Sequence, residues 1–232
     1  MHQIYLNPSI RERICRWRFK ILIVIIGLRS SSLEDVLHAD YSKKHFQKYL
    51  SFKGRVNFLV NLVGSLLSNE RKKVKLLSVG PRFESELYGY RGLGLRWKNI
   101  KAIDTYSYSP RIKVGNMHHI EYPNEHFNIV VCGWTLAYSK NPLLALREFE
   151  RILADNGLLI LTWDLPLSFD ISLFPSLTLS RRNNIDDPES SIEDPNVFDL
   201  VSKFFCLHRL EIGKLDFYGA TPFATLVLKK CS

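Results

Sequence analysis

The chain has 232 residues, of which 46% are hydrophobic and 24% are charged. This length and composition suit an ordinary globular protein with one sizeable core and an appendage. The four cysteines (Cys15, Cys132, Cys206 and Cys231) are scattered, without C-x-x-C spacing. The sequence therefore predicts neither a zinc site nor a disulfide framework, and a reducing cytoplasm is the expected location.

The net charge of +9 is concentrated near the N-terminus. Residues 1–60 hold eleven Lys or Arg against four Asp or Glu, which gives +7 and leaves +2 for residues 61–232. This asymmetry indicates an anionic partner, such as nucleic acid, a membrane surface or an acidic substrate, or simply a solvated basic face. We expect residues 1–70 to form a basic N-terminal helical extension and residues 71–232 to form the main domain.

An apolar run, Ile21 to Leu28, follows the cationic residues of the extension. A membrane-spanning helix needs about 20 apolar residues, and this run already ends at Arg29. The next three residues are serines, which make a poor signal-peptide cleavage site. We therefore expect a buried helix or strand and no transmembrane segment, with shallow contact at a membrane surface as the alternative.

The remaining elements follow in chain order. Apolar residues at helical spacing over 58–67 predict a helix with one buried face. From residue 74 onward strands and helices alternate: strands at 74–79, 100–103, 127–132 and 158–162, helices at 82–90 and 142–153, then strands at 207–212 and 223–228. The alternation predicts an α/β fold with a doubly wound, mostly parallel sheet. The last two strands have no helix between them and predict a terminal antiparallel hairpin.

Two residues at strand ends suggest a ligand site. Gly80 closes the first predicted strand, where glycine lets the backbone approach a ligand. Asp104 closes the second strand 24 residues later, near the spacing at which an acid reaches a ribose hydroxyl pair. There is no G-x-G-x-x-G fingerprint and no G-x-x-x-x-G-K-[ST] loop, which argues against a dinucleotide or a nucleoside triphosphate.

Residues 74–162 resemble the core of class I, Rossmann-like S-adenosylmethionine-dependent methyltransferases. Gly80 and Asp104 occupy the two strand ends. Residues 115–123 (GNMHHIEYP) resemble the family's G-D-x-x-x-L-P segment, and residues 127–131 (FNIVV) resemble its F-D-x-V strand. Residues 141–157 resemble the following helix and its L-x-P-G-G turn. The order and spacing of these matches carry the resemblance.

The resemblance implies S-adenosylmethionine as cofactor and a set of residues that bind it: Val79, Gly80, Glu84, Asp104, Asn116, Met117, Gly133 and Trp134. Val79 and Gly80 would pass near the methionine part, and Asp104 would hold the ribose hydroxyls. No metal ligand is implied.

The other implied positions lie further along the chain. Asn116 would sit near the adenine amino group, with Met117 packed on the ring. Gly133 and Trp134 would border the site of methyl transfer.

The sequence departs from the family at the glycine-rich motif. The pattern D-x-G-x-G-x-G becomes Ser78-Val79-Gly80-Pro81-Arg82-Phe83-Glu84, which loses the acid and two of three glycines. Side chains therefore occupy the loop that would face the cofactor, and Glu84 or Glu86 becomes the candidate partner of the methionine ammonium.

A catalytic base cannot be chosen from the sequence. His118, His119, Tyr138 and Asp164 lie on segments expected near strand ends, and a hydroxyl or ring-carbon acceptor would benefit from such a base. A [DN]-P-P-[YF] motif is absent after the strand at 127–132, where the chain reads CGWTL. A nucleic-acid amino acceptor is therefore not expected.

These observations favour an enzyme that transfers a methyl group to a small-molecule, lipid or glycan acceptor (EC 2.1.1). The alternative is a catalytically silent methyltransferase-like fold that binds a ligand or partner. An NAD-dependent oxidoreductase fails on the missing fingerprint, and an RNA-binding basic arm has few aromatic residues for stacking. The expected location is cytoplasmic, or peripheral at a membrane surface.

Overall fold

A computed structural model describes residues 2–25, 31–32, 53–165, 199, 201–214 and 222–230. The chain divides into two compact units, Met1–Met117 and His118–Ser232. The expected division into an extension and a main domain near residue 70 stays a prediction. Within the described ranges, no helix has both the length and the apolar character needed to cross a membrane.

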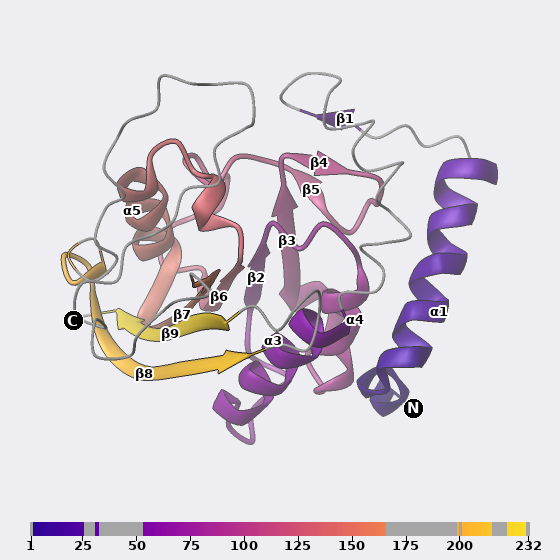
Figure 1. Cartoon of the computed structure of the whole chain (residues 1–232), viewed down its shortest axis with the longest axis horizontal. Helices are drawn as coiled ribbons and strands as arrows, with labels where there is room; N and C mark the ends of the chain where they lie inside the picture. The colour runs from indigo at the N-terminus through magenta and orange to yellow at the C-terminus, as the bar shows by residue number, and fades with distance from the viewer. Residues whose placement is uncertain are drawn as a thin grey trace. The chain divides into compact units, whose positions relative to one another are not determined.

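The first unit is built on three parallel strands in the order β5-β3-β2 (Figure 1). These are β2 (Leu76–Val79), β3 (Ile100–Asp104) and β5 (Lys113–Val114). A short antiparallel pair joins β1 (Ser31–Ser32) to β4 (Tyr106–Ser107). All four residues of β2 are buried, as expected for a parallel strand covered on both faces.

Within the described residues, this unit has the α-helices α1 (Pro8–Phe19), α3 (Lys53–Leu66) and α4 (Ser85–Gly92). The 3₁₀ turn η1 (His2–Leu6) precedes α1, the π-helical turn η2 (Lys20–Ile25) follows it, and the 3₁₀ turn η3 (Trp97–Asn99) leads into β3. Asn7 caps α1 by accepting hydrogen bonds from the Ser9 and Ile10 amides, with Pro8 at the first helical position. The apolar run is thus helical as far as Ile25, and its Leu22 is buried.

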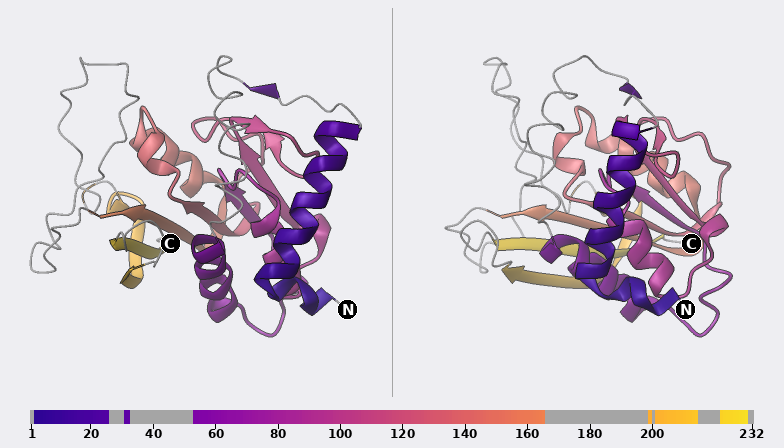
Figure 2. Two further views of the ribbon diagram at one scale, coloured as in Figure 1. Left: turned by 45° about the vertical axis from the view of Figure 1, so that its right-hand side comes forward. Right: turned by 90° about the vertical axis from the view of Figure 1, so that its right-hand side faces the viewer.

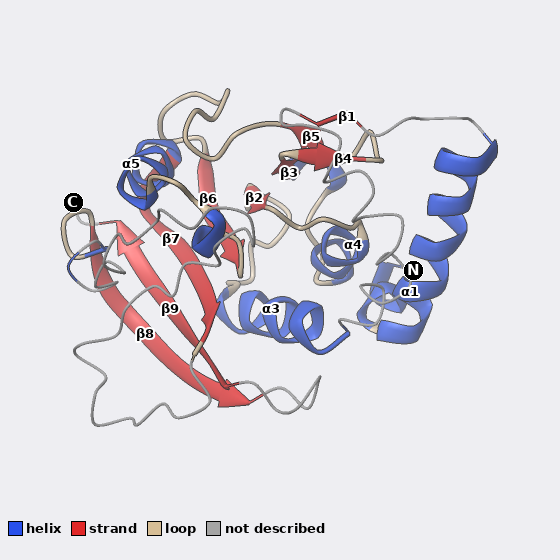
Figure 3. Ribbon diagram, turned by 45° about the horizontal axis from the view of Figure 1, so that its top comes forward, coloured by secondary structure: helices blue, strands red, loops and turns tan. Residues whose placement is uncertain are grey.

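The second unit carries four strands in the order β6-β7-β9-β8 (Figure 3). They are β6 (Phe127–Gly133), β7 (Leu153–Asp164), β8 (Phe205–Lys214) and β9 (Pro222–Lys230). β6 and β7 are parallel, and β9 pairs antiparallel with both β7 and β8. The 3₁₀ turn η4 (Leu136–Tyr138) and helix α5 (Pro142–Ile152) lead from β6 to β7.

The seven strands make a mixed, mostly parallel α/β sheet with a closing antiparallel hairpin and an N-terminal helix, which confirms the predicted fold class. One local prediction was wrong. The strand expected from residue 158 begins at Leu153, so the turn that the resemblance placed at the end of residues 141–157 is an irregularity inside β7. Four residues of β7 oppose one of β6 there, between the pairs Phe127–Leu153 and Ile129–Leu158. Asn156 adopts a positive φ of 60°, which asparagine tolerates better than most residues.

The cysteine expectation was also wrong in one respect. Cys206, on β8, is disulfide-bonded, whereas Cys15 and Cys132 are free and buried. The scattered spacing of the cysteines gave no sign of this disulfide. Disulfides persist mainly in oxidising compartments, so cysteine usage no longer supports a reducing cytoplasm. The cytoplasmic location stays a prediction.

The disulfide predicts a thiol count. One bond uses two of the four cysteines. A thiol reagent applied to the unfolded protein without reductant should therefore titrate two thiols per chain, and after reduction four. The measurement is a colorimetric thiol assay in denaturant. Four thiols before reduction would contradict the disulfide.

Candidate functional site

The parallel register of the first unit places three candidate positions at one sheet edge. Val79 pairs with Ile103, and Asp104 pairs with Val114, so Gly80, Asp104 and Gly115 all follow at the carboxyl ends of their strands. The Gly80 amide donates to the Ile103 carbonyl at 2.8 Å, and the Gly115 amide donates to the Asp104 carbonyl at 2.9 Å. This edge is where open α/β sheets bind ligands.

The loop after β2 folds onto the Asp104 carboxylate. Gly80 has a φ of 70° and Arg82 a φ of 53°, both in the left-handed region. The Arg82 amide donates to Asp104 Oδ2 at 2.9 Å. Arg82 thus keeps a backbone conformation that suits glycine, at a steric cost that glycine would avoid. The loop therefore keeps the backbone conformation of a glycine-containing loop although residue 82 is an arginine. It lies beside Asp104, so Gly80 and Asp104 are close together, as their spacing in the sequence predicted.

Burial raises the pKa of the Asp104 carboxyl above its ordinary value of 3.8. The charge of Arg82 and the backbone amides of Arg82, Thr105 and Tyr106 oppose this rise. A carboxylate at this position can accept hydrogen bonds from two neighbouring hydroxyl groups. Asp104 therefore has the chemistry that the ribose of a nucleoside requires.

Glu84 is held by the N-terminal helix. Its side chain is fully buried. Arg18 of α1 donates to it twice, from Nε to Oε2 at 2.5 Å and from Nη2 to Oε1 at 3.0 Å. The Ser109 hydroxyl also donates to Oε1, and Arg111 lies within ion-pair distance at 3.9 Å. Both oxygens of Glu84 are thus occupied by groups of the first unit.

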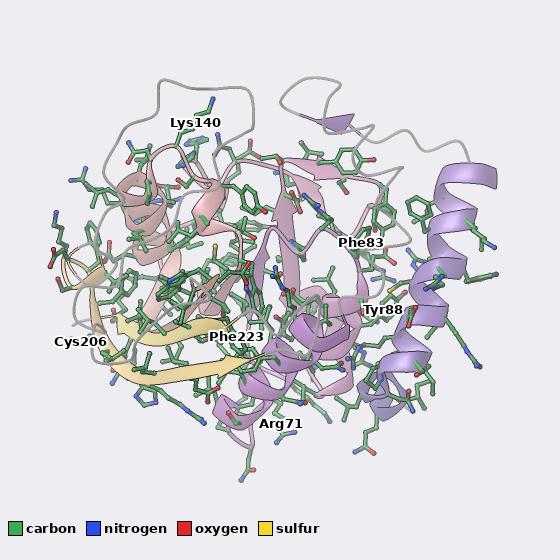
Figure 4. The ribbon with its side chains drawn as sticks, viewed as in Figure 1. Arg71, Phe83, Tyr88, Lys140, Cys206 and Phe223 are labelled. Atoms are coloured by element: carbon green, nitrogen blue, oxygen red, sulfur yellow. The ribbon has the colours of Figure 1, made fainter. Side chains whose placement is uncertain are left out.

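An aromatic cluster surrounds this ion pair. Phe19 and Phe83 both pack on Tyr108, with ring centroids 5.1 and 6.0 Å apart, and Tyr88 packs edge-on against Trp97. Phe83 and Tyr88 point from the loop and from α4 toward α1 (Figure 4). The N-terminal helix is therefore part of the wall that supports the loop after β2.

Glu86 has a different environment. It is buried on α4, only 6% exposed. Ser78 Oγ and Tyr90 Oη both donate to its Oε1, at 2.6 and 2.7 Å. Its Oε2 accepts no hydrogen bond within the part of the chain that the structure describes. Burial raises the pKa of Glu86 above its ordinary value of 4.5, and the nearby charge of Asp104 adds to the rise.

Ser78 stands where the family pattern has an acid, and its hydroxyl contacts Glu86 directly. A carboxylate therefore lies beside the position from which the sequence had lost one. Of the two glutamates considered from the sequence, Glu86 is the one with an unpaired oxygen. The i, i+4 spacing of Glu86 and Tyr90 was a signal in the sequence, but the contact with Ser78 was not, because it crosses from helix to strand.

The remaining first-unit candidates also follow the strand ends. Val79 is the buried last residue of β2. Asn116 and Met117 come after β5, with Asn116 exposed and Met117 half-buried. Their positions agree with a ligand at this edge, and their roles stay predictions.

In the second unit, Gly133 ends β6 and Trp134 follows with a φ of 57°, rare for so bulky a residue. Two hydrogen bonds hold it there: its amide donates to the Thr162 carbonyl at 2.6 Å, and its indole Nε1 donates to Asp164 Oδ1 at 2.7 Å. Trp134 also packs on Phe223 of β9. Backbone strain of this kind is often found at functional sites.

The four candidate bases differ in their hydrogen bonds and exposure. Asp164 accepts from Trp134, as above. His118 Nε2 lies 2.7 Å from the Ser139 hydroxyl, whereas His119 and Tyr138 are exposed. No three His, Cys, Asp or Glu side chains gather as a metal site within the described ranges.

Comparison with known proteins agrees with this arrangement. Residues 95–161 match the family model described as a methyltransferase domain. No curated protein matches the chain in sequence. A Listeria monocytogenes protein classed as an S-adenosylmethionine-dependent methyltransferase is similar in fold, with a TM-score of 0.54 at 13% identity over 74% of this chain and 96% of its own.

Two further solved structures share the fold. A SAM-dependent methyltransferase from Thermotoga maritima has a TM-score of 0.50 and 15% identity, covering 82% of this chain and 98% of its own. An S-adenosylmethionine-dependent methyltransferase from Mesorhizobium loti also has a TM-score of 0.50, with 10% identity over 76% and 98%. Residues 95–161 are thus similar to a methyltransferase domain, and the solved structures show that the chain shares its fold with these proteins.

Proposed function

We propose that the enzyme methylates a small-molecule, lipid or glycan acceptor and holds S-adenosylmethionine at the strand ends of the first unit. The observation that carries the proposed binding site is the hydrogen bond from the Arg82 amide to Asp104, which closes residues 80–82 on that carboxylate. Burial and the charge of Asp104 both raise the pKa of Glu86, whose Oε2 is unpaired among the described residues. A buried carboxylate with an unpaired oxygen suits a cation, and S-adenosylmethionine carries an ammonium group and a sulfonium.

Each residue has a proposed role. Asp104 accepts hydrogen bonds from the ribose hydroxyls. Glu86 Oε2 accepts from the methionine ammonium, in place of Glu84, whose oxygens are occupied. Val79 and Gly80 present backbone to the methionine part.

Two further proposed contacts lie after β5. Asn116 meets the adenine amino group through its amide oxygen, and Met117 packs on the adenine ring. Asn116 keeps an acceptor where the family pattern has an acid, so this substitution preserves the hydrogen bond.

Gly133 and Trp134 are the proposed border of the acceptor site. The cofactor's sulfonium supplies an already activated methyl group, so positioning of the acceptor accounts for much of the rate. The hydrogen bond that the Trp134 indole donates to Asp164 holds the ring, which packs on Phe223. The CGWTL sequence at 132–136 supports an acceptor other than a nucleic-acid amino group.

The test is a calorimetric titration of the purified chain with S-adenosylmethionine and S-adenosylhomocysteine, repeated with Asp104→Asn. The substitution removes the charge while keeping one acceptor oxygen. Hydrogen bonds to a charged group contribute about 1.5–3 kcal/mol, so affinity for both ligands should fall about tenfold to about a hundredfold. Asn128→Ala, at an exposed position on β6, is the control and should bind as the wild type does.

Absence of binding to a folded wild-type chain would overturn the proposed site. Binding with no turnover over a panel of phenolic, lipid and glycan acceptors would instead favour the catalytically silent alternative.

A further inference from the structure

The outward face of α1 and its C-cap combines cationic side chains with one large apolar side chain. Arg13, Arg16, Trp17 and the C-cap residue Lys20 are all exposed and occupy positions i, i+3, i+4 and i+7. Residues at this spacing share one side of a helix. Trp17 is 64% exposed, the largest value among the exposed large hydrophobic residues of the described chain.

The opposite face of α1 packs against the rest of the first unit. Arg11 and Cys15 are buried, and Arg18 binds Glu84. Arg11 donates to the carbonyls of Tyr5 and Leu6 and to the side chain of Asn57 on α3. These contacts fix the rotation of the helix, so Trp17 and its cationic neighbours must face outward. In Figure 1, α1 lies at the margin of the first unit, and Figure 2 shows it from that side.

The charge of this face is mostly uncompensated. Glu12 pairs with Arg16 at 2.5 Å, whereas Arg13 and Lys20 have no ion pair within the described residues. The net charge of +7 over residues 1–60 has the same sign. An anionic partner is therefore complementary to this surface.

We propose that the outward face of α1, formed by Arg13, Arg16, Trp17 and Lys20, docks the protein on an anionic lipid bilayer. Indole rings favour the membrane–water interface, where the apolar ring and the N–H are both accommodated. Each Lys or Arg near an anionic surface adds attraction. A nucleic acid is the less suitable partner, because single-strand binding normally uses several stacking aromatics and this face carries one.

The inference goes beyond methyl transfer and does not depend on it. The face lies on the side of α1 away from Glu84, so docking would leave the loop after β2 free to bind its ligand. The bilayer would act as a platform that concentrates the enzyme on one surface.

The experiment is vesicle co-sedimentation of the full chain with phosphatidylcholine alone and with phosphatidylcholine containing phosphatidylserine. We expect binding only to the anionic vesicles, decreasing as salt is raised. The variant Arg13→Glu/Lys20→Glu should weaken binding at least about twentyfold, since each cation contributes a factor of about five. Brominated lipid should quench part of the tryptophan fluorescence in the wild type, and that part should be missing in Trp17→Phe.

Controls separate docking from folding and from the proposed cofactor site. Arg13→Glu/Lys20→Glu should retain the wild-type melting temperature and S-adenosylmethionine titration, because neither residue contacts the loop after β2. Lys98→Glu, at an exposed position of η3, should leave vesicle binding unchanged. Equal binding to neutral and anionic vesicles, no binding to either, or tighter binding to a single-stranded RNA than to anionic vesicles would each overturn the proposal.

Discussion

Replacing Arg18 by Met should lower the free energy of unfolding by about 3–5 kcal/mol, the range measured when one partner of a buried ion pair is removed. Glu84 is fully buried, and Arg18 makes both of its short charged contacts. Met keeps much of the apolar contact but leaves the carboxylate without its main counter-charge. The measurement is chemical denaturation of the variant and the wild type at neutral pH.

The matched control is Arg16→Met on the same helix. Arg16 pairs with Glu12 at 2.5 Å, but its side chain is 46% exposed, so its loss should cost less than about 1 kcal/mol. The double variant Arg18→Met/Glu84→Gln should recover part of the loss, because no buried charge is then left unpaired. Equal, small losses for Arg16→Met and Arg18→Met would contradict a buried ion pair between α1 and Glu84.

Replacing Glu86 by Gln should move stability and ligand affinity in opposite directions. Gln can still accept from Ser78 and Tyr90 at the same oxygen, while the buried charge disappears. Burial raises the pKa of Glu86, so its folded form releases a proton less readily than its unfolded form. Its ionised form therefore destabilises the fold at neutral pH, and Glu86→Gln should raise the melting temperature.

The affinity of the same variant for S-adenosylmethionine should fall about tenfold to about a hundredfold, as expected when a charged hydrogen bond is lost. In the wild type, acidification should weaken binding because Glu86 and Asp104 gain protons. Burial raises the pKa of both carboxyls, so binding should be lost at a higher pH than an ordinary carboxyl would give.

Glu84→Gln is the matched control for this second prediction. It should lower the melting temperature by weakening the pair with Arg18, yet the folded protein should bind S-adenosylmethionine within about threefold of the wild type. The reverse result, with affinity lost in Glu84→Gln and kept in Glu86→Gln, would place the ammonium at Glu84.

Substitutions in binding sites often stabilise the fold while they weaken function. The pair Ser78 and Glu86 shows how this chain departs from the methyltransferase pattern that it resembles. The strand position that usually carries an acid is a hydroxyl here, and the acid lies in the first turn of α4. The Arg82 backbone keeps a left-handed conformation that its side chain disfavours.

The sequence by itself determined the order and type of the longer strands β2, β3, β6, β7, β8 and β9 and of the helices α3, α4 and α5, but not the two-residue strands β1, β4 and β5. Its buried runs and amphipathic helix positions depend on local periodicity, which is readable along the chain. The spacing of Gly80 and Asp104 was also sufficient to pair them, because parallel strands in register bring their carboxyl ends together. The resemblance to methyltransferases followed from these positions together with the 115–123 and 127–131 segments.

The tertiary structure decided which glutamate is available and what the basic extension contacts. Glu84 and Glu86 are two residues apart and look equivalent in sequence, yet the helix turns them to different neighbours: one meets Arg18 and the other meets Ser78. The outward direction of Trp17 likewise depends on packing between distant segments, through Arg11 with Asn57 and Arg18 with Glu84. Such contacts have no local signature, because burial and charge pairing are fixed only when the chain has folded.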